Sequence, residues 1–221
     1  MRDGVRTAFE SKSWAGRNVP RSGPGSTLAA TAPLREALPD LFERYAVKTF
    51  LDAPCGDWTW MQQVDLNGIN YIGGDISLEV VQSVQEQHTA PGREFRHLDI
   101  TSDPLPQADL MMCRDCLFHL KWWLRWAFFE NFAQSDIPFL LTTKHHVSKN
   151  AKLGNNAGFK LFNPCAAPFN LPEPIEEICE TGTLNSDPEF LQTREGRLQR
   201  SIAIWSKEQV IDALKRRENE T

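Results

Sequence analysis

The sequence lacks any apolar run of the roughly 18 to 20 residues that a membrane-spanning helix needs. Its polar start, MRDGVRTAFESKSW, contains no apolar stretch of the kind found in a secretory signal peptide. The five cysteines are an odd number without the spacing of a disulfide framework, which is typical of reduced thiols. These absences predict a cytoplasmic protein without membrane spans and without structural disulfides.

Positive charge is also scarce. Lys and Arg number 24 against 29 Asp and Glu, which gives a formal net charge of −5. A chain with this balance repels a polyanion, so we do not expect a nucleic acid as partner. With 41% hydrophobic and 24% charged residues, the 221-residue chain has the composition of a folded globular protein and the length of one domain.

The chain is expected to divide into an N-terminal segment and one domain. Residues 1–26 are rich in Arg, Gly, Ser and Pro and run into PRSGPGST, which favours an arm or lid that is not a core element. The domain is expected over residues 27–221. Its first part, TLAATAPLREALPDLFERYA, has apolar residues at helical spacing, with Pro33 and Pro39 expected to break the helix into pieces.

Short apolar runs then alternate with helical stretches. We expect strands at VKTFLDA, INYIGGD, REFRHLD, ADLMMCR and IPFLLTT, and helices near 58–64, 78–88 and 120–134. Residues 145–172 hold Gly, Asn and Pro without periodicity, which predicts a long functional loop that shapes a pocket lid. The runs PIEEICE and LQRSIAIWS are expected to pair antiparallel at one edge, before a charged helix from about Lys207. The predicted fold is α/β and Rossmann-like: a mostly parallel seven-stranded sheet with an antiparallel edge strand and helices on both faces.

The first strand ends in DAPCGDW, where open α/β sheets hold a cofactor. A dinucleotide turn needs GxGxxG so that backbone amides come close to a pyrophosphate, whereas this turn has only Gly56. Asp52 and Asp57 would repel a diphosphate and favour a cationic ligand. S-adenosylmethionine carries a sulfonium and an ammonium and no phosphate. The turn therefore favours this cofactor over a nicotinamide dinucleotide.

Each polar residue of the turn has an expected role. Asp52 is expected to receive the ammonium, directly or through water, and Gly56 to let the backbone approach the nucleoside. Asp57 either caps the following helix or faces the ligand. Trp58 and Trp60 are candidates for contact with the cofactor or the acceptor, because their turn lies at the site.

Acids also end the next two strands. Asp75 in YIGGDIS follows Asp52 by 23 positions, close to the spacing of about 20 at which a strand-end acid binds ribose hydroxyls. Asp99 in FRHLDIT is expected to accept a hydrogen bond from the adenine amino group, with Ile76 and Ile100 as the apolar walls around the base. Three acids at successive strand ends are expected to lie at one edge of the sheet.

In this order, FLDAPCGDW, YIGGDIS, FRHLDIT and MMCRDCLFHL resemble the motifs of class I S-adenosylmethionine-dependent methyltransferases, in particular small bacterial-type members with a DAPCGD turn. The resemblance covers about Arg21 to Ser206. It implies that the first three motifs bind the cofactor and that Arg114 and Asp115 lie beside the methyl group. Pro54 departs from the commoner acid-x-Gly-x-Gly pattern of the family. With the neighbouring residues of the turn, the expected cofactor-binding set is Asp52, Pro54, Cys55, Gly56, Asp57, Trp58, Asp75, Ile76, Asp99, Ile100 and Arg114.

The fourth strand leads to the expected acceptor side. In MMCRDCLFHLKWWLRW, Asp115 and His119 are four residues apart and share a face if a helix begins here. Either residue is a candidate general base for a hydroxyl acceptor, a role worth about 10² to 10⁴ in rate. The alternative for His119 is a helix-start histidine bonded to the backbone. The expected substrate-binding residues are Trp60 of the first turn and, at the end of the fifth strand, Lys144, His145 and His146.

Other chemistries fit less well. CRDC and His119 form a CxxCxxH pattern, but Cys113 is expected inside the strand and a fourth zinc ligand is not evident, so we expect no metal. The Asp-Pro-Pro-Tyr motif of amino-nitrogen DNA methylation is missing, and NPCAAPF follows the fifth strand, where the Pro-Cys nucleophile of cytosine C5 methyltransferases does not belong.

We therefore expect an S-adenosylmethionine-dependent methyltransferase that acts on a small polar acceptor, at a hydroxyl oxygen of a small molecule or glycan. The alternatives are a methyltransferase acting on RNA or a protein side chain, an S-adenosylmethionine-binding protein without catalysis, and a nicotinamide dehydrogenase.

Overall fold

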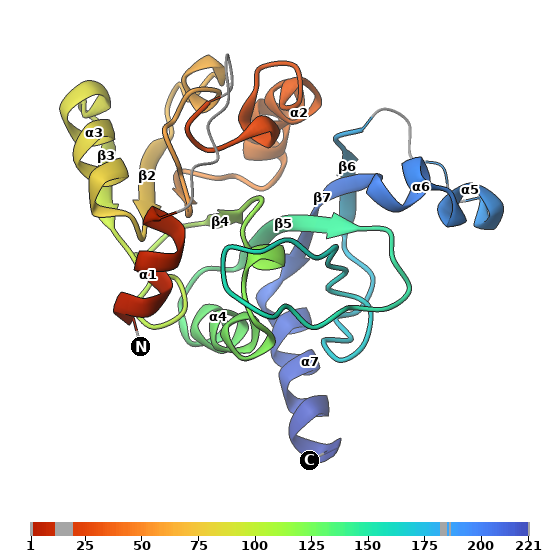
Figure 1. Ribbon diagram of the computed structural model, residues 1–221. Helices are drawn as coiled ribbons and strands as arrows, with labels where there is room; N and C mark the ends of the chain where they lie inside the picture. Colours follow the sequence, from red (N-terminus) through yellow and green to blue (C-terminus); the bar gives the residue numbers. More distant parts are fainter. Residues whose placement is uncertain (1, 12–19, 182–184, 186, 221) are drawn as a thin grey trace.

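The computed structural model describes residues 2–11, 20–181, 185 and 187–220 (Figure 1). Within these residues, seven strands form one sheet in the order β3-β2-β1-β4-β5-β7-β6. The parallel strands are β1 (Thr49–Asp52), β2 (Asn70–Asp75), β3 (Arg93–His97), β4 (Leu110–Cys113) and β5 (Phe139–His145). Strand β7 (Arg200–Ser206) is antiparallel to β5 and to the edge strand β6 (Glu176–Cys179). The predicted seven-stranded α/β sheet is confirmed, and its antiparallel strand lies next to one edge.

Helices cover both faces of the sheet, as predicted. Because successive strand residues point to opposite faces, β4 contributes side chains to two hydrophobic clusters. Met111 and Cys113 lie in the cluster under α4 (Trp122–Gln134) and α7 (Lys207–Glu220), while Leu110 and Met112 lie under α2 (Ala32–Arg44) and α3 (Leu78–His88). Figure 1 shows α4 and α7 side by side. No helix in the part of the chain that the structure describes is long and apolar enough to cross a bilayer.

The expectation that prolines divide the first helix of the domain is wrong. Helix α2 is continuous, with Pro33 in its first turn, where a missing N–H costs nothing because it would have no helical partner. Pro39 lies inside the helix and removes a hydrogen bond. The apolar face of α2 is fully buried and offsets this loss; its side chains are Leu34, Leu38 and Leu41.

The helix expected near residues 58–64 is also wrong. Only one short 3-10 turn, η2 (Met61–Gln63), forms there. Trp58 has φ 57°, in the left-handed region, so an α-helix cannot start at the end of the first turn. The first turn therefore has no helix N-terminus behind it, in contrast to a dinucleotide-binding turn.

The N-terminal segment includes a helix with one side chain in the hydrophobic core. Residues Arg2–Glu10 form helix α1, and Val5 is buried in the same cluster as α4. A 3-10 turn, η1 (Pro24–Ser26), follows further along the segment, and residues 12–19 lie outside the described part of the chain. The expectation that this segment has no core element is wrong at Val5.

The long segment after β5 is irregular, as predicted, but well packed. Between β5 and β6 it contains no helix or strand, and all of its residues are described. Phe162, Phe169 and Leu171 are buried in the main core cluster. Two short helices, α5 (Pro188–Gln192) and α6 (Arg194–Leu198), connect β6 to β7. These buried side chains pack the second half of the segment after β5 onto the domain.

Candidate functional site

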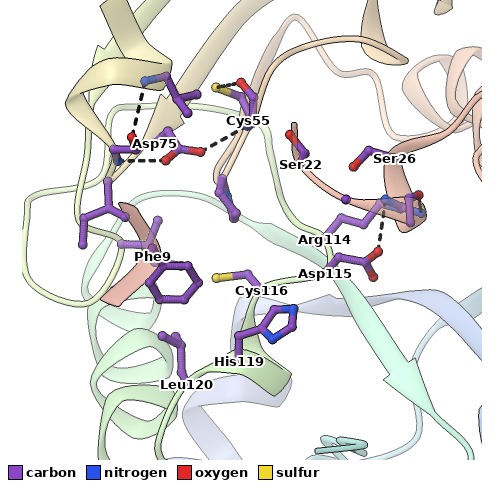
Figure 2. Close-up of a pocket in the computed structure, with 18 of the residues that line it drawn as sticks. Phe9, Ser22, Ser26, Cys55, Asp75, Arg114, Asp115, Cys116, His119 and Leu120 are labelled. Carbon is purple, nitrogen blue, oxygen red and sulfur yellow. Dashed lines mark hydrogen bonds and ion pairs between the residues drawn. The ribbon is translucent and has the colours of Figure 1, made fainter. Parts of the chain in front are cut away.

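A cavity of about 630 Å³ opens at the carboxyl ends of β1, β2 and β4, where Asp52, Asp75 and Arg114 line it. Open α/β sheets bind ligands at this edge, and the volume is in the range of small-molecule sites. Helix α1 and residues 21–26 close the opposite side. Figure 2 shows Phe9 of α1 on one side of the cavity and Ser22 and Ser26 on another.

The structure brings most of the expected cofactor-binding residues to this cavity. Those that line it are Asp52, Pro54, Cys55, Gly56, Asp75, Ile76, Asp99, Ile100 and Arg114. Trp60 and the two candidate bases, Asp115 and His119, line it as well. Residues separated by as many as 67 positions in the sequence, from Asp52 to His119, therefore face one space.

Asp75 is held in place by backbone amides at the end of β2. Its Oδ2 accepts from the amide of Gly56 at 3.2 Å and its Oδ1 from the amide of Ser77 at 2.9 Å. Burial raises the pKa of Asp75, although these amides counteract the rise. Gly56 has φ 56°, and a Cβ there would lie 2.2 Å from Ser22 Oγ. The turn therefore requires glycine at this position.

Asp52 is a buried acid at the end of β1. Burial raises its pKa to about 7, even though the Tyr71 hydroxyl donates to its Oδ2 at 2.7 Å and Arg114 lies near. Near neutral pH the protonated and ionised forms of this carboxyl are therefore both populated. A cation bound in the cavity would favour the ionised form.

Asp57 joins the N-terminal segment to the first turn through hydrogen bonds. Its amide donates to Ser22 Oγ at 2.9 Å, and its Oδ2 accepts from the Ser22 amide at 3.2 Å. Its Oδ1 accepts from the amide of Thr59. The role as cap of an α-helix is wrong, because no α-helix follows, and Asp57 is not among the described residues that line the cavity.

The two tryptophan side chains of the turn lie in different environments. Trp58 is 3% exposed, and its ring packs against Tyr71 and Phe95, with the Arg93 guanidinium 4.3 Å from the ring centroid. It does not appear among the described residues of the cavity lining. Trp60 does line the cavity, and the Arg114 guanidinium lies 5.4 Å from its ring centroid.

Three charged residues that line the cavity, Arg114, Asp115 and Arg200, form a largely buried network with Glu180, and we call these four residues the charge cluster. Arg114 Nε donates to Glu180 Oε1 at 2.7 Å, and Arg200 Nε lies 3.2 Å from Glu180 Oε2. Arg200 Nη1 also donates to Asp115 Oδ2 at 3.0 Å. Two positive and two negative side chains give the charge cluster a net charge of zero.

Sequence reasoning missed Glu180 and Arg200. The signal that could have found them is the expected antiparallel pairing of PIEEICE with LQRSIAIWS, whose register places Cys179 opposite Ser201. The next pair outward is Glu180, which directly follows β6, and Arg200, the first residue of β7. The Glu180 amide donates to the Arg200 carbonyl at 3.1 Å. Opposite charges at paired strand ends indicate an ion pair.

Asp115 is held in an unusual backbone conformation. It has φ 51°, and its amide donates to Thr143 Oγ1 at 2.9 Å. Helix α4 begins only at Trp122, so the expectation that Asp115 and His119 share a helix face is wrong. Burial would raise the pKa of Asp115, but Arg114 and Arg200 lower it below its ordinary value. A carboxylate stabilised in this way is a weak base.

His119 ends a 3-10 turn, η3 (Leu117–His119), at the cavity. Its Nδ1 contacts the carbonyl oxygen of Gly158. A carbonyl only accepts, so Nδ1 carries the proton and Nε2 is the basic nitrogen of the neutral ring. Of the two candidate bases, the histidine is therefore better suited to accept a proton.

Arg125 supports the backbone around His119. Its guanidinium is fully buried; Nε donates to the Leu120 carbonyl at 2.8 Å and Nη2 to the Phe118 carbonyl at 3.5 Å. It also lies 4.5 Å from the centroid of Phe162. Burial lowers the pKa of Arg125 to about 10. No sequence pattern singled out this arginine, because on a helix it resembles any surface cation.

Lys144, His145 and His146 are not among the described residues that line the cavity. Lys144 pairs with Glu177, His146 Nε2 lies 3.0 Å from Ser201 Oγ, and His145 is buried. Burial lowers the pKa of His145 to about 4. These contacts give no support to a substrate-binding role. Within the described ranges, no three His, Cys, Asp or Glu side chains are grouped to hold a metal ion.

No protein-family model matches the sequence, and no curated protein matches it. Solved structures do. The 1,6-didemethyltoxoflavin-N1-methyltransferase of Burkholderia thailandensis, with bound 1,6-didemethyltoxoflavin and S-adenosylhomocysteine, has a TM-score of 0.60 at 14% identity, over 92% of this chain and 87% of its own.

Two further methyltransferases are similar at low identity. Magnesium protoporphyrin IX methyltransferase of Synechocystis PCC 6803, with bound S-adenosylmethionine, has a TM-score of 0.54 at 11% identity, over 93% of this chain and 94% of its own. The N-methyltransferase NodS of Bradyrhizobium japonicum WM9 has a TM-score of 0.55 at 12% identity, over 82% and 98%. The chain therefore has the Rossmann-like fold of these methyltransferases.

Proposed function

We propose that this protein is an S-adenosylmethionine-dependent methyltransferase that transfers a methyl group to a hydroxyl oxygen of a small molecule or glycan. The observation that carries the proposal is one cavity at the carboxyl edge of this fold. It combines the strand-end acids Asp52, Asp75 and Asp99 with the basic nitrogen of His119.

The residues of the cavity fit this cofactor. Asp52 is a buried acid at the first turn, where the phosphates of a dinucleotide would lie, so its ionised form would repel a diphosphate. S-adenosylmethionine instead brings a sulfonium and an ammonium. We assign Asp52 to the ammonium, Asp75 to the ribose hydroxyls and Asp99 to the adenine, with Ile76 and Ile100 beside the base.

The protein's own residues supply positioning and proton transfer. When bound, S-adenosylmethionine supplies a methyl group that forms a bond to the acceptor oxygen as the carbon–sulfur bond breaks. His119 Nε2 accepts the proton of the hydroxyl, and the Gly158 carbonyl holds the other ring proton. The ionised Asp115 stabilises the resulting imidazolium. A placed base contributes about 10² to 10⁴ in rate.

The N-terminal segment, residues 1–26, serves as a lid over the domain of residues 27–221 in this proposal. Its support is the reciprocal pair between Ser22 and Asp57 and the hydrogen bond from Arg114 Nη2 to the Gly25 carbonyl at 2.8 Å. A Cβ at Gly25 would lie 2.4 Å from Asp115 Oδ2. This close approach covers part of the charge cluster and reduces its contact with water, which strengthens its electrostatic interactions.

A thermal-shift panel tests the cofactor. S-adenosylmethionine and S-adenosylhomocysteine are expected to stabilise the protein, whereas NAD and NADP are not, and stabilisation by NAD alone would refute the proposal. Asp75→Ala is expected to abolish the shift, because it removes the acid assigned to the ribose. Asp212→Ala, which removes an exposed acid of α7, is the matched control and keeps the shift.

A second variant tests the chemistry. His119→Ala is expected to keep the thermal shift with S-adenosylhomocysteine and to lose methyl transfer, measured by mass spectrometry of the product, because Nε2 is the proposed base. Full activity of this variant would show that His119 is not the base. Loss of the thermal shift would show that the residue is needed for binding or folding.

A further inference from the structure

The end of the cavity that holds His119 has an apolar wall. Its side chains, which we call the aromatic end, are Val5, Phe9, Cys116, Phe118, Leu120 and Phe159. They come from α1, from the segment around η3 and from the loop after β5. Figure 2 shows Phe9, Cys116, His119 and Leu120 gathered there, apart from Cys55 and Asp75 at the cofactor end.

The rings of the aromatic end surround the candidate base. The centroid of His119 lies 4.3 Å from that of Phe118, 6.1 Å from that of Phe159 and 6.5 Å from that of Phe9. Phe118 and Phe159 meet edge to face at 5.2 Å. Aromatic rings prefer this edge-to-face geometry or offset stacking. A planar ring of a ligand bound here could therefore contact the edges or the faces of these side chains.

One of these rings is largely uncovered. Phe159 is 52% exposed, the largest exposure among the large hydrophobic side chains of the described residues. It lies on a segment whose neighbours Phe162 and Phe169 are buried, so its backbone is anchored while its ring faces the cavity. An exposed apolar ring in a cavity wall favours a ligand that covers it with apolar surface.

Polar groups near this end already bond to one another. Asp115 accepts from Arg200 at 3.0 Å, and Arg114 and Arg200 both contact Glu180. A sugar would bury several hydroxyl groups against the apolar wall without partners, which is unfavourable. A molecule with one hydroxyl directed at His119 avoids that cost.

We propose that the methyl acceptor is a flat aromatic molecule that carries a hydroxyl group on its ring. The ring lies against Phe9, Phe118 and Phe159, and the hydroxyl meets Nε2 of His119. A ring hydroxyl of the tyrosine type has a pKa of about 10, against about 6.5 for imidazole, so proton transfer to a histidine is far easier than from an aliphatic alcohol. This inference rests on the proposed function and replaces a glycan with an aromatic hydroxyl as acceptor.

Calorimetric titration of the protein saturated with S-adenosylhomocysteine tests the inference. The probes are 2-naphthol and, as a sugar hydroxyl, methyl α-D-glucopyranoside. We expect 2-naphthol to bind and the glucoside not to bind. Phe159→Ala is expected to weaken 2-naphthol binding about tenfold, because the ring loses an aromatic contact. The control Trp123→Ala removes an aromatic side chain of similar exposure, 47%, outside the cavity lining and keeps the affinity.

The outcomes separate this inference from the function on which it rests. If S-adenosylhomocysteine binds but 2-naphthol does not, or if the glucoside binds as well as 2-naphthol, the aromatic acceptor is wrong and the methyltransferase proposal stands. An unchanged affinity for 2-naphthol in Phe159→Ala also overturns the inference. If S-adenosylhomocysteine itself does not bind, the proposed function fails and the inference fails with it.

Discussion

Replacing Glu180 by glutamine tests the charge cluster. The Glu180 side chain is fully buried and contacts both Arg114, at 2.7 Å, and Arg200, at 3.2 Å. Glu180→Gln keeps the shape but leaves the buried Arg114 and the half-buried Arg200 with only Asp115 as ion-pair partner. Breaking a buried pair in this way costs about 3 to 5 kcal/mol. For a chain of this length, that loss lowers Tm by roughly 6 to 20 °C.

The same substitution at Glu176, the first residue of β6, provides the control. Glu176 accepts two hydrogen bonds from Arg44, at 2.8 and 3.0 Å, but its side chain is 30% exposed. An exposed pair contributes about 1 kcal/mol or less, so Glu176→Gln is expected to lower Tm by at most about 4 °C. Thermal unfolding by scanning calorimetry measures both variants. Equal values of Tm for the two would refute the reasoning that burial makes the charge cluster important for stability.

Three further predictions concern the site. Because a protonated Asp52 cannot pair with the ligand ammonium, the Kd for S-adenosylhomocysteine is expected to rise about tenfold from pH 8 to pH 6 as the pH falls through the pKa of about 7; calorimetry measures it. Gly56→Ala is expected to weaken the same binding at least about tenfold, since its Cβ would lie 2.2 Å from Ser22 Oγ and its φ of 56° is strained. Arg125→Met is expected to lower kcat about tenfold with little change in KM, because it removes the donors that hold the backbone on either side of His119 while leaving the cavity lining intact.

Each of these predictions has a matched comparison. Asp52→Asn should make Kd independent of pH between 6 and 8, and a wild-type Kd that does not change over this range would contradict the ammonium assignment. The double variant Gly56→Ala, Ser22→Gly relieves the contact but not the strained φ, so it should recover only part of the affinity. Arg125→Lys keeps the charge and a donor, and equal kcat values for wild type, Arg125→Met and Arg125→Lys would exclude a positioning role.

The meeting of the three strand-end acids in one cavity was predictable because it depends on regular geometry. Alternating apolar runs locate strands, and parallel strands bring their carboxyl ends to one edge of a sheet. Asp52, Asp75 and Asp99 each follow or end such a run, so their meeting in one cavity follows from strand positions alone.

The remaining features depend on contacts that local patterns do not encode. Trp58 and Trp60 are two residues apart and chemically alike, yet Trp58, whose φ is left-handed, is buried in the core and Trp60 lines the cavity. The Ser22 to Asp57 pair joins residues 35 positions apart, and Arg114 meets Glu180 across 66 positions. Propensities and periodicity describe windows of a few residues, so tertiary packing decides these cases.

The aromatic end takes none of its side chains from a strand. Its residues lie on α1, around η3 and in the loop after β5, whereas the strand-end acids belong to the sheet. A change at Phe9 or Phe159 therefore leaves the sheet register and the acids untouched. In the methyltransferase that we propose, choice of acceptor is thus an exchangeable property: we expect redesign of these two side chains to change which acceptor binds, while the strand-end acids and the scaffold stay as they are.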